Sequence, residues 1–233
     1  MLKKRARADA DKRLRRRDIL RAAAQAFAEA PLSSLTMTDV ARRAGLAKGT
    51  IYAYFASKEA LFLQLVTESL AEWFAAVEAE LQRAREPLTA ESLAGLLART
   101  LAADSQLTRL LTVLHPVLEE NIDDALALEF KRRVRDQLVG AGLLLERRCR
   151  ELAPASADPD APPEPVLGPG DGVRFLLDLD ALVIGLHAMA TPSAAVARVL
   201  ALPELAPMRV DFAAELQLAT TRLLRGWHEP RAR

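Results

Sequence analysis

Hydroxyl and ammonium side chains concentrate in one short stretch near the N-terminus: Thr36, Thr38, Lys48, Thr50, Tyr52, Tyr54 and Lys58. In the major groove of duplex DNA, lysine donates hydrogen bonds to guanine acceptors and small apolar groups contact the thymine methyl. Threonine and tyrosine hydroxyls reach phosphates. We therefore expect these residues, together with Gly49 between them, to contact DNA.

Individual members of this set have simpler explanations. Tyr52 or Tyr54 alone could be packed against the fold with its hydroxyl at the surface. Lys58 lies in the first turn of a predicted helix, where free backbone N–H groups attract anions, but it could also be a solvated lysine. Packing explains the whole set much less well than it explains one tyrosine.

The sequence offers little for catalysis or metal binding. It has three histidines, one cysteine and no glycine-rich phosphate loop, and no Cys/His spacing suits a metal. Cys149 lies in an arginine-rich stretch without a nearby base, so we expect an inert or slowly oxidised surface thiol. The sequence therefore predicts neither an enzyme nor a cofactor or metal site.

Charge is distributed unevenly along the 233 residues. Residues 1–58 contain 14 Lys and Arg against 5 Asp and Glu, a net charge of +9, which leaves −8 for residues 59–233 and +1 for the chain. A compact basic module is typical of a polyanion-binding protein. A basic segment at a membrane surface is the alternative, but it would explain Arg13–Arg17 and not the pattern at Lys48–Lys58.

The contact residues need helices to position them. Apolar periodicity predicts an amphipathic helix from Asp11 to Ala30. Thr36, with an acid three residues later, predicts the start of a short helix that ends at Ala44 before a turn at Gly45. A second short helix is expected over 48–55, and a long one from Lys58, capped by Ser57, to about Arg85. Two short helices joined by a glycine turn on a preceding helix form a helix-turn-helix unit.

The rest of the chain also reads as helices, at 89–102, 105–114, 124–152, 172–190 and 207–227, with a further short one at 193–200. No alternation typical of strands occurs, so the fold class is all-α. Residues 153–171 hold six of the thirteen prolines, which predicts a mobile loop. The longest apolar tract, 175–190, is interrupted by two aspartates and a histidine, and no apolar run follows the basic N-terminus. We expect a cytoplasmic protein without a membrane span.

The stretch LTMTDVARRAGLAKGTIYAYFASKEALF, residues 35–62, and the preceding helix DILRAAAQAFAEA resemble the tetracycline-repressor (TetR) family of bacterial transcriptional regulators. The resemblance covers about a fifth of the chain and is highly specific. It implies an all-helical homodimer with an N-terminal DNA-binding domain and a C-terminal domain for dimerisation and effector binding. By position, Lys48, Thr50, Tyr52 and Tyr54 would lie on the recognition helix, and Thr36 and Lys58 would hold phosphates.

The chain departs from the family at Ala47, where a serine often caps the recognition helix. Loss of this cap costs about 1 kcal/mol of local stability. The domain boundaries that follow are a basic disordered tail at 1–11, a helix-turn-helix domain at 12–58, and an effector-binding and dimerisation domain at 59–233.

Two C-terminal helices are apolar on more than one side, which predicts burial against a second subunit as well as the chain's own core. A monomeric core is the alternative. The expected dimer interface consists of Leu179, Val183, Phe212, Leu216, Ala219 and Leu223.

Polar or polarisable groups set among apolar residues are candidates for an effector site. They are Trp73, Phe74, His115, Asn121, Arg174, His187 and Met189. Each also has a structural explanation: Arg174 and Asp178 are spaced to form an ion pair, a buried histidine is usually held by a hydrogen bond, and methionine fills gaps. Taken together, the sequence predicts a repressor that is released from a palindromic operator by a small apolar effector. The alternatives are an effector-independent regulator and a basic helical protein of the membrane surface or a scaffold.

Overall fold

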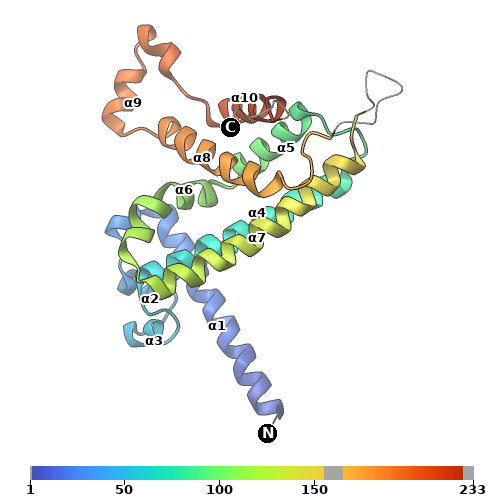
Figure 1. Ribbon diagram of the computed structural model, residues 1–233. Helices are drawn as coiled ribbons and strands as arrows, with labels where there is room; N and C mark the ends of the chain where they lie inside the picture. Colours follow the sequence, from blue (N-terminus) through green and yellow to red (C-terminus); the bar gives the residue numbers. More distant parts are fainter. Residues whose placement is uncertain (1, 155–164, 228–233) are drawn as a thin grey trace. The chain divides into compact units, whose positions relative to one another are not determined.

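The computed structural model describes residues 2–154 and 165–227, and the regular elements within these ranges are all helices (Figure 1). This agrees with the all-α prediction. The α-helices are α1 (Leu2–Glu29), α2 (Met37–Arg43), α3 (Lys48–Tyr52), α4 (Lys58–Arg83), α5 (Ala90–Ala103), α6 (Ser105–Val113), α7 (Asp124–Glu151), α8 (Gly172–Ala190), α9 (Ala194–Leu200) and α10 (Phe212–Arg225).

Short 3-10 and π turns lie between some of these helices. The 3-10 turns are η1 (Leu32–Ser34), η3 (Glu119–Asn121) and η4 (Pro203–Met208), and η2 (Leu114–Leu118) is a π-turn. The chain divides into two compact units. The first contains residues 1–69 and 113–131, and the second contains residues 70–112 and 132–233.

The core of the first unit is formed by one apolar face from each of its helices. Ile19 and Phe27 of α1, Val40 of α2 and Ile51 of α3 are buried together with Phe62 of α4. The rings of Phe27 and Phe62 meet edge to face with centroids 5.8 Å apart. Edge-to-face contact is a favourable geometry for aromatic rings, so it fixes α4 against α1.

Helix α1 begins at Leu2, so the prediction of a disordered tail at 1–11 is wrong. Residues 2–17 are almost entirely Ala, Leu, Lys and Arg, which are strong helix formers, and no glycine or proline occurs before Pro31. The basic charge of this segment was a reason to expect disorder, but its high helix propensity allows α1 to continue through it.

Local signals correctly placed the helix-turn-helix turn. Thr36 and Asp39 form a capping box at the start of α2, and Gly45 adopts a φ of +67°. Because this left-handed backbone strains any residue with a side chain, glycine suits the position. Helix α3 is shorter than predicted and ends at Tyr52, because Ala53 and Tyr54 donate backbone hydrogen bonds to the carbonyls three residues earlier and tighten the chain into a turn.

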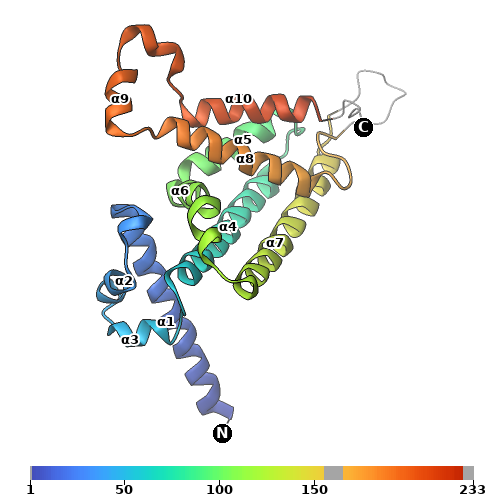
Figure 2. The same ribbon diagram turned by 60° about the vertical axis from the view of Figure 1, so that its left-hand side comes forward.

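The second unit is built around α10, which packs along α5 and α8 (Figure 2). Its core includes Leu97 of α5, Phe175 of α8 and Leu216 of α10. Phe175 also meets the ring of Trp227 edge to face at 5.8 Å. Helix α8 has the predicted bounds. Helix α10 begins five residues later than predicted, because Asp211 caps it by accepting a 2.8 Å hydrogen bond from Ala214 N.

Between α8 and α10 the chain forms an arm of α9 and η4 that extends away from both helices in the two views (Figures 1 and 2). Arg209 holds the arm together by donating to the carbonyls of Leu200 and Ala201 at 2.7 and 2.8 Å. The predicted proline-rich loop falls partly outside the described residues, and its described part at 165–171 forms turns.

Among the described residues, α4 is long and apolar enough to cross a membrane by composition, and 56% of its apolar window is buried inside the protein. A buried core helix of a soluble protein has the same properties. The apolar tract at 175–190, which the sequence analysis considered instead, forms α8.

Candidate nucleic-acid interface

Helix α3 presents a contiguous exposed surface. Lys48, Gly49, Thr50 and Tyr52 are all exposed, whereas Ile51 on the opposite side is fully buried and anchors the helix. Within the described residues, the polar groups of Lys48, Thr50 and Tyr52 are not engaged in any hydrogen bond or ion pair. Donors left free on a rigidly anchored short helix are what recognition of base edges requires.

Tyr54 lies beyond the end of α3 and is half-buried, so its predicted place on the recognition helix is wrong. Its backbone carbonyl instead accepts a 3.3 Å hydrogen bond from the Arg16 guanidinium. The same guanidinium lies over the Phe55 ring, 4.4 Å from its centroid, and donates to Gln64 Oε1 at 3.2 Å. Arg16 therefore joins α1 and α4 to the turn that follows α3.

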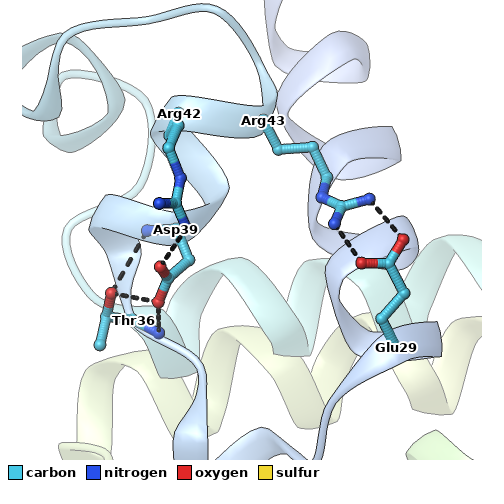
Figure 3. A network of polar contacts seen from close by, with 5 residues as sticks. All are labelled: Glu29, Thr36, Asp39, Arg42 and Arg43. Carbon is cyan, nitrogen blue, oxygen red and sulfur yellow. Dashed lines mark hydrogen bonds and ion pairs between the residues drawn. The ribbon is translucent and has the colours of Figure 1, made fainter.

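Thr36 is exposed, but its side chain is committed to capping α2 (Figure 3). Its hydroxyl accepts from Asp39 N at 3.2 Å and donates to Asp39 Oδ2 at 2.6 Å. Hydrogen bonds from the Thr36 hydroxyl and backbone lower the pKa of Asp39. A phosphate would have to compete with this carboxylate for the hydroxyl proton. The exposed hydroxyl of Thr38, by contrast, has no hydrogen-bond partner within the described residues.

Two arginines at the end of α2 pair with carboxylates of the same unit (Figure 3). Arg42 bonds Asp39 at 2.8 Å, and Arg43 forms a two-pronged pair with Glu29 of α1. Hydrogen bonding to Arg43 lowers the pKa of Glu29. The paired, planar geometry fixes the end of α2 against α1.

Lys58, which is expected to hold a phosphate, also contacts groups within the protein. Its ammonium group donates to the carbonyl oxygens of Leu32 and Leu35, each at 3.2 Å. Two of its three donors are therefore used on the segment between α1 and α2. The expected position in the first turn of α4 is correct, and Ser57 caps that helix by accepting from Ala60 N at 3.0 Å.

The predicted effector residues are divided between the two units. His115 and Asn121 belong to the first unit and are exposed: His115 bonds Glu119 at 3.1 Å, and Asn121 donates to the Val117 carbonyl at 2.7 Å. Arg174 in the second unit pairs with Asp178 at 2.6 Å. The ion pair explains Arg174, whereas Met189 is exposed and fills no gap in the core.

His187, Trp73 and Phe74 lie in the second unit. His187 packs edge to face on Phe212 at 5.5 Å, and burial, followed by repulsion from Arg109, lowers its pKa. Trp73 is buried and donates to Thr100 Oγ1 at 3.0 Å. Phe74 lines a cleft of about 560 Å³ between α4 and α7. The other lining residues are Ala71, Ala75, Glu78, Gly140, Ala141, Leu143, Leu144 and Arg147.

Cys149 is fully buried, so the prediction of a surface thiol is wrong. Burial raises its pKa to about 11, which keeps the thiol protonated and unreactive at neutral pH. No group of three His, Cys, Asp or Glu side chains suited to a metal occurs in the part of the chain that the structure describes.

Three residues of the predicted dimer interface instead form the core of the second unit. Leu179, Val183 and Leu216 are buried within the chain. Phe212, Ala219 and Leu223 are half-buried. Because α8 and α10 have apolar residues on more than one side, periodicity did not distinguish the inner side from the outer one. The exposed sides of these two helices carry Leu177, Ala181, Gly185, Ala188, Ala214 and Leu218.

Comparison with protein families gives two matches that together span most of the chain. The family described as "Bacterial regulatory proteins, tetR family" matches residues 19–65, and "Tetracyclin repressor-like, C-terminal domain" matches residues 67–159 and 163–231. The chain belongs to the TetR family. It is therefore a DNA-binding transcriptional regulator. No curated protein matches the chain.

Solved structures share this TetR fold at low sequence identity. The fatty acid degradation regulator FadR from Bacillus halodurans is 20% identical, with 94% of this chain and 97% of that chain covered and a TM-score of 0.53. A TetR/AcrR regulator from Thermobifida fusca is 21% identical, with 94% and 99% covered and a TM-score of 0.51. FadR from Bacillus subtilis, in complex with stearoyl-CoA, is 19% identical, with 89% and 96% covered and a TM-score of 0.50.

Proposed function

We propose that this TetR regulator is a cytoplasmic, non-enzymatic homodimeric repressor that binds a palindromic operator through α3 and is released by a small, largely apolar effector. The unpaired face of Lys48, Thr50 and Tyr52 is the observation that carries the DNA-reading part of the proposal. A two-fold dimer presents two copies of α3, so the half-sites would be centred about 34–36 Å apart, one helical turn of DNA.

A second copy would cover the exposed sides of α8 and α10. Leu177 and Leu218 are 45% and 42% exposed, and small residues surround them, which allows two helices to approach closely. Leu179, Val183 and Leu216 would lie beneath this interface, packed in the core of each subunit. Phe212, Ala219 and Leu223, which are half-buried, would lie at its margin.

The effector is proposed to act on the second unit through α4, because this continuous helix begins next to the recognition helix and ends in that unit. A ligand shifts DNA binding only if its affinity differs between the DNA-competent and DNA-incompetent states. A roughly 100-fold difference corresponds to about 2.7 kcal/mol of coupling. The cleft of Phe74, Leu143 and Leu144 offers apolar walls beside the positive charge of Arg147.

Selection of bound duplexes from random DNA tests the proposed operator. We expect a palindromic motif. Lys48→Ala should weaken binding to this motif by about 1–3 kcal/mol and relax preference at one base pair, with little change on random DNA. Lys131→Ala, which removes an exposed lysine paired with Glu119, is the matched control. Equal losses on motif and random DNA would assign Lys48 to a phosphate and not to a base.

Release by an effector is tested by titrating small molecules against the labelled operator complex. Long-chain acyl-CoAs are suitable first compounds, because FadR of Bacillus subtilis has the same fold and binds stearoyl-CoA. A releasing compound should lose potency on Phe74→Ala, and on His187→Ala if the site extends to α8. If no compound releases the complex, an effector-independent regulator is the better assignment.

A further inference from the structure

The N-terminal half of α1 is a strongly basic helix. Residues 2–17 contain nine Lys and Arg against two Asp. In both views this half of α1 extends beyond α2 and α3 of the same unit (Figures 1 and 2). At 1.5 Å per residue it is about 22 Å long.

A cleft of about 290 Å³ lies at the base of this basic helix. Lys12, Arg13 and Arg16 of α1 form one wall, and Ala53 and Tyr54, which directly follow the recognition helix, form the other. Its volume corresponds to about ten water molecules at roughly 30 Å³ each. The cleft therefore has room for a phosphodiester group with part of its hydration shell.

Arg16 fixes the two walls of the cleft relative to each other. Its guanidinium bonds the Tyr54 carbonyl and lies over the Phe55 ring, so its charge is partly used within the fold. Lys12 and Arg13 are exposed, and neither has an ion-pair or hydrogen-bond partner among the side chains described from residue 10 onward. The cleft thus combines one fixed cation with two available ones.

We propose that this cleft binds a phosphate of the DNA backbone flanking each operator half-site, with Lys12 and Arg13 as the contacting residues and Arg16 as the residue that positions the cleft. This inference rests on the proposed DNA-reading role of α3, which immediately precedes Ala53 and Tyr54. An anionic membrane surface also attracts basic helices. DNA fits better, because one wall of the cleft is continuous with the recognition helix.

The test compares the salt dependence of DNA binding for the wild type and for the double variant Lys12→Ala/Arg13→Ala. Each phosphate contact contributes about 0.9 to the slope of log affinity against log salt concentration. We expect the slope to decrease in magnitude by about 2, with equal loss of affinity on the selected operator and on a random-sequence duplex about three helical turns long. Arg21→Ala is the control, because Arg21 lies on α1, is 65% exposed, and does not line the cleft.

The length of the duplex provides an independent readout. On an operator trimmed to its two half-sites, the wild type and the double variant should bind equally, because the flanking phosphate is missing. Retained helicity and thermal stability of the double variant would show that it is folded.

An unchanged slope on the long duplex would overturn the inference while leaving the operator motif intact. Failure to select any motif would instead reject the proposed function. If the double variant kept the wild-type slope on DNA but lost binding to vesicles of phosphatidylserine and phosphatidylcholine, the basic half of α1 would be a membrane contact.

Discussion

Single basic residues in the DNA-binding unit have two distinct roles, and their hydrogen bonds distinguish them. Lys58 and Arg16 donate to backbone carbonyls at 3.2 and 3.3 Å, so they hold the helices of this unit in place. Lys48 makes no such bond and is available to DNA. All three are cations within or near the same motif, and the partners of Lys58 and Arg16 are contributed by other helices or connecting segments.

Replacement of Lys58 should therefore affect folding before it affects DNA contacts. Lys58→Ala leaves the carbonyls of Leu32 and Leu35 without their donor, and we expect the free energy of unfolding to decrease by about 1–2 kcal/mol. Lys48→Ala, the matched control, should change stability by less than about 0.5 kcal/mol. Denaturant unfolding measures both. Unchanged stability of Lys58→Ala with a salt slope lowered by about 1 would restore the phosphate role.

Gly49 allows a second residue-scale prediction. A methyl group added at this position would meet nothing within 4 Å in the free protein. Gly49→Ala should therefore raise stability by about 0.5–1 kcal/mol, because alanine loses less conformational freedom in a helix. If the backbone of α3 closely approaches DNA, the same change should weaken operator binding about tenfold. A more stable variant with wild-type affinity would show that position 49 does not approach DNA.

At the scale of elements, the crossing of α7 and α8 depends on a pair of glycines. A Cβ on Gly142 would lie 2.9 Å from backbone atoms of Gly172 and Val173. Gly172 N also donates a 2.8 Å hydrogen bond to the buried Glu146. The two helix backbones therefore touch where α8 begins, and neither can move without breaking this bond.

Alanine substitutions at two glycines of α7 should have opposite effects on stability. Gly142→Ala should lower the free energy of unfolding by about 1–3 kcal/mol, because the backbones must move apart. Gly140→Ala, two residues earlier with nothing within 4 Å of an added Cβ, should raise stability by about 0.5–1 kcal/mol. Thermal unfolding of the two variants measures the difference. Similar effects for both would mean that the crossing tolerates a methyl group.

At the scale of the whole molecule, the second unit carries exposed apolar residues that the proposed dimer would cover. Leu177 and Leu218 are exposed on α8 and α10, and Val196, Val199, Leu202 and Met208 are exposed on the arm of α9 and η4. Large contiguous apolar surface is uncommon on monomeric soluble proteins. A second copy of the chain is the partner that the proposed palindromic operator requires.

A charge on the exposed side of α10 should dissociate this dimer. We expect the wild type to sediment at about 51 kDa, twice the chain mass of 25.5 kDa, and Leu218→Glu to sediment as a monomer at micromolar concentration. The control is Leu128→Glu, which places the same charge on an exposed leucine of α7 in the first unit. A dimeric Leu218→Glu would show that the interface lies elsewhere.

The sequence by itself determined the features that depend on neighbouring residues. The capping box of Thr36 and Asp39, the left-handed turn at Gly45 and the bounds of α8 were all predictable, because caps, glycine and apolar periodicity act over a few positions along the chain. The DNA-binding motif was predictable for the same reason, since its residues are close together in the sequence.

The tertiary structure decided the features that depend on residues distant in the sequence. Lys58 bonds carbonyls more than twenty positions away, and Arg16 reaches the turn after α3. Helices α8 and α10 are apolar on more than one side, and the packing of α10 against α5 and α8 selected which residues became core. Hydrogen bonds and burial between distant segments form only when the chain has folded, so a local pattern can propose several partners for a residue but cannot choose among them.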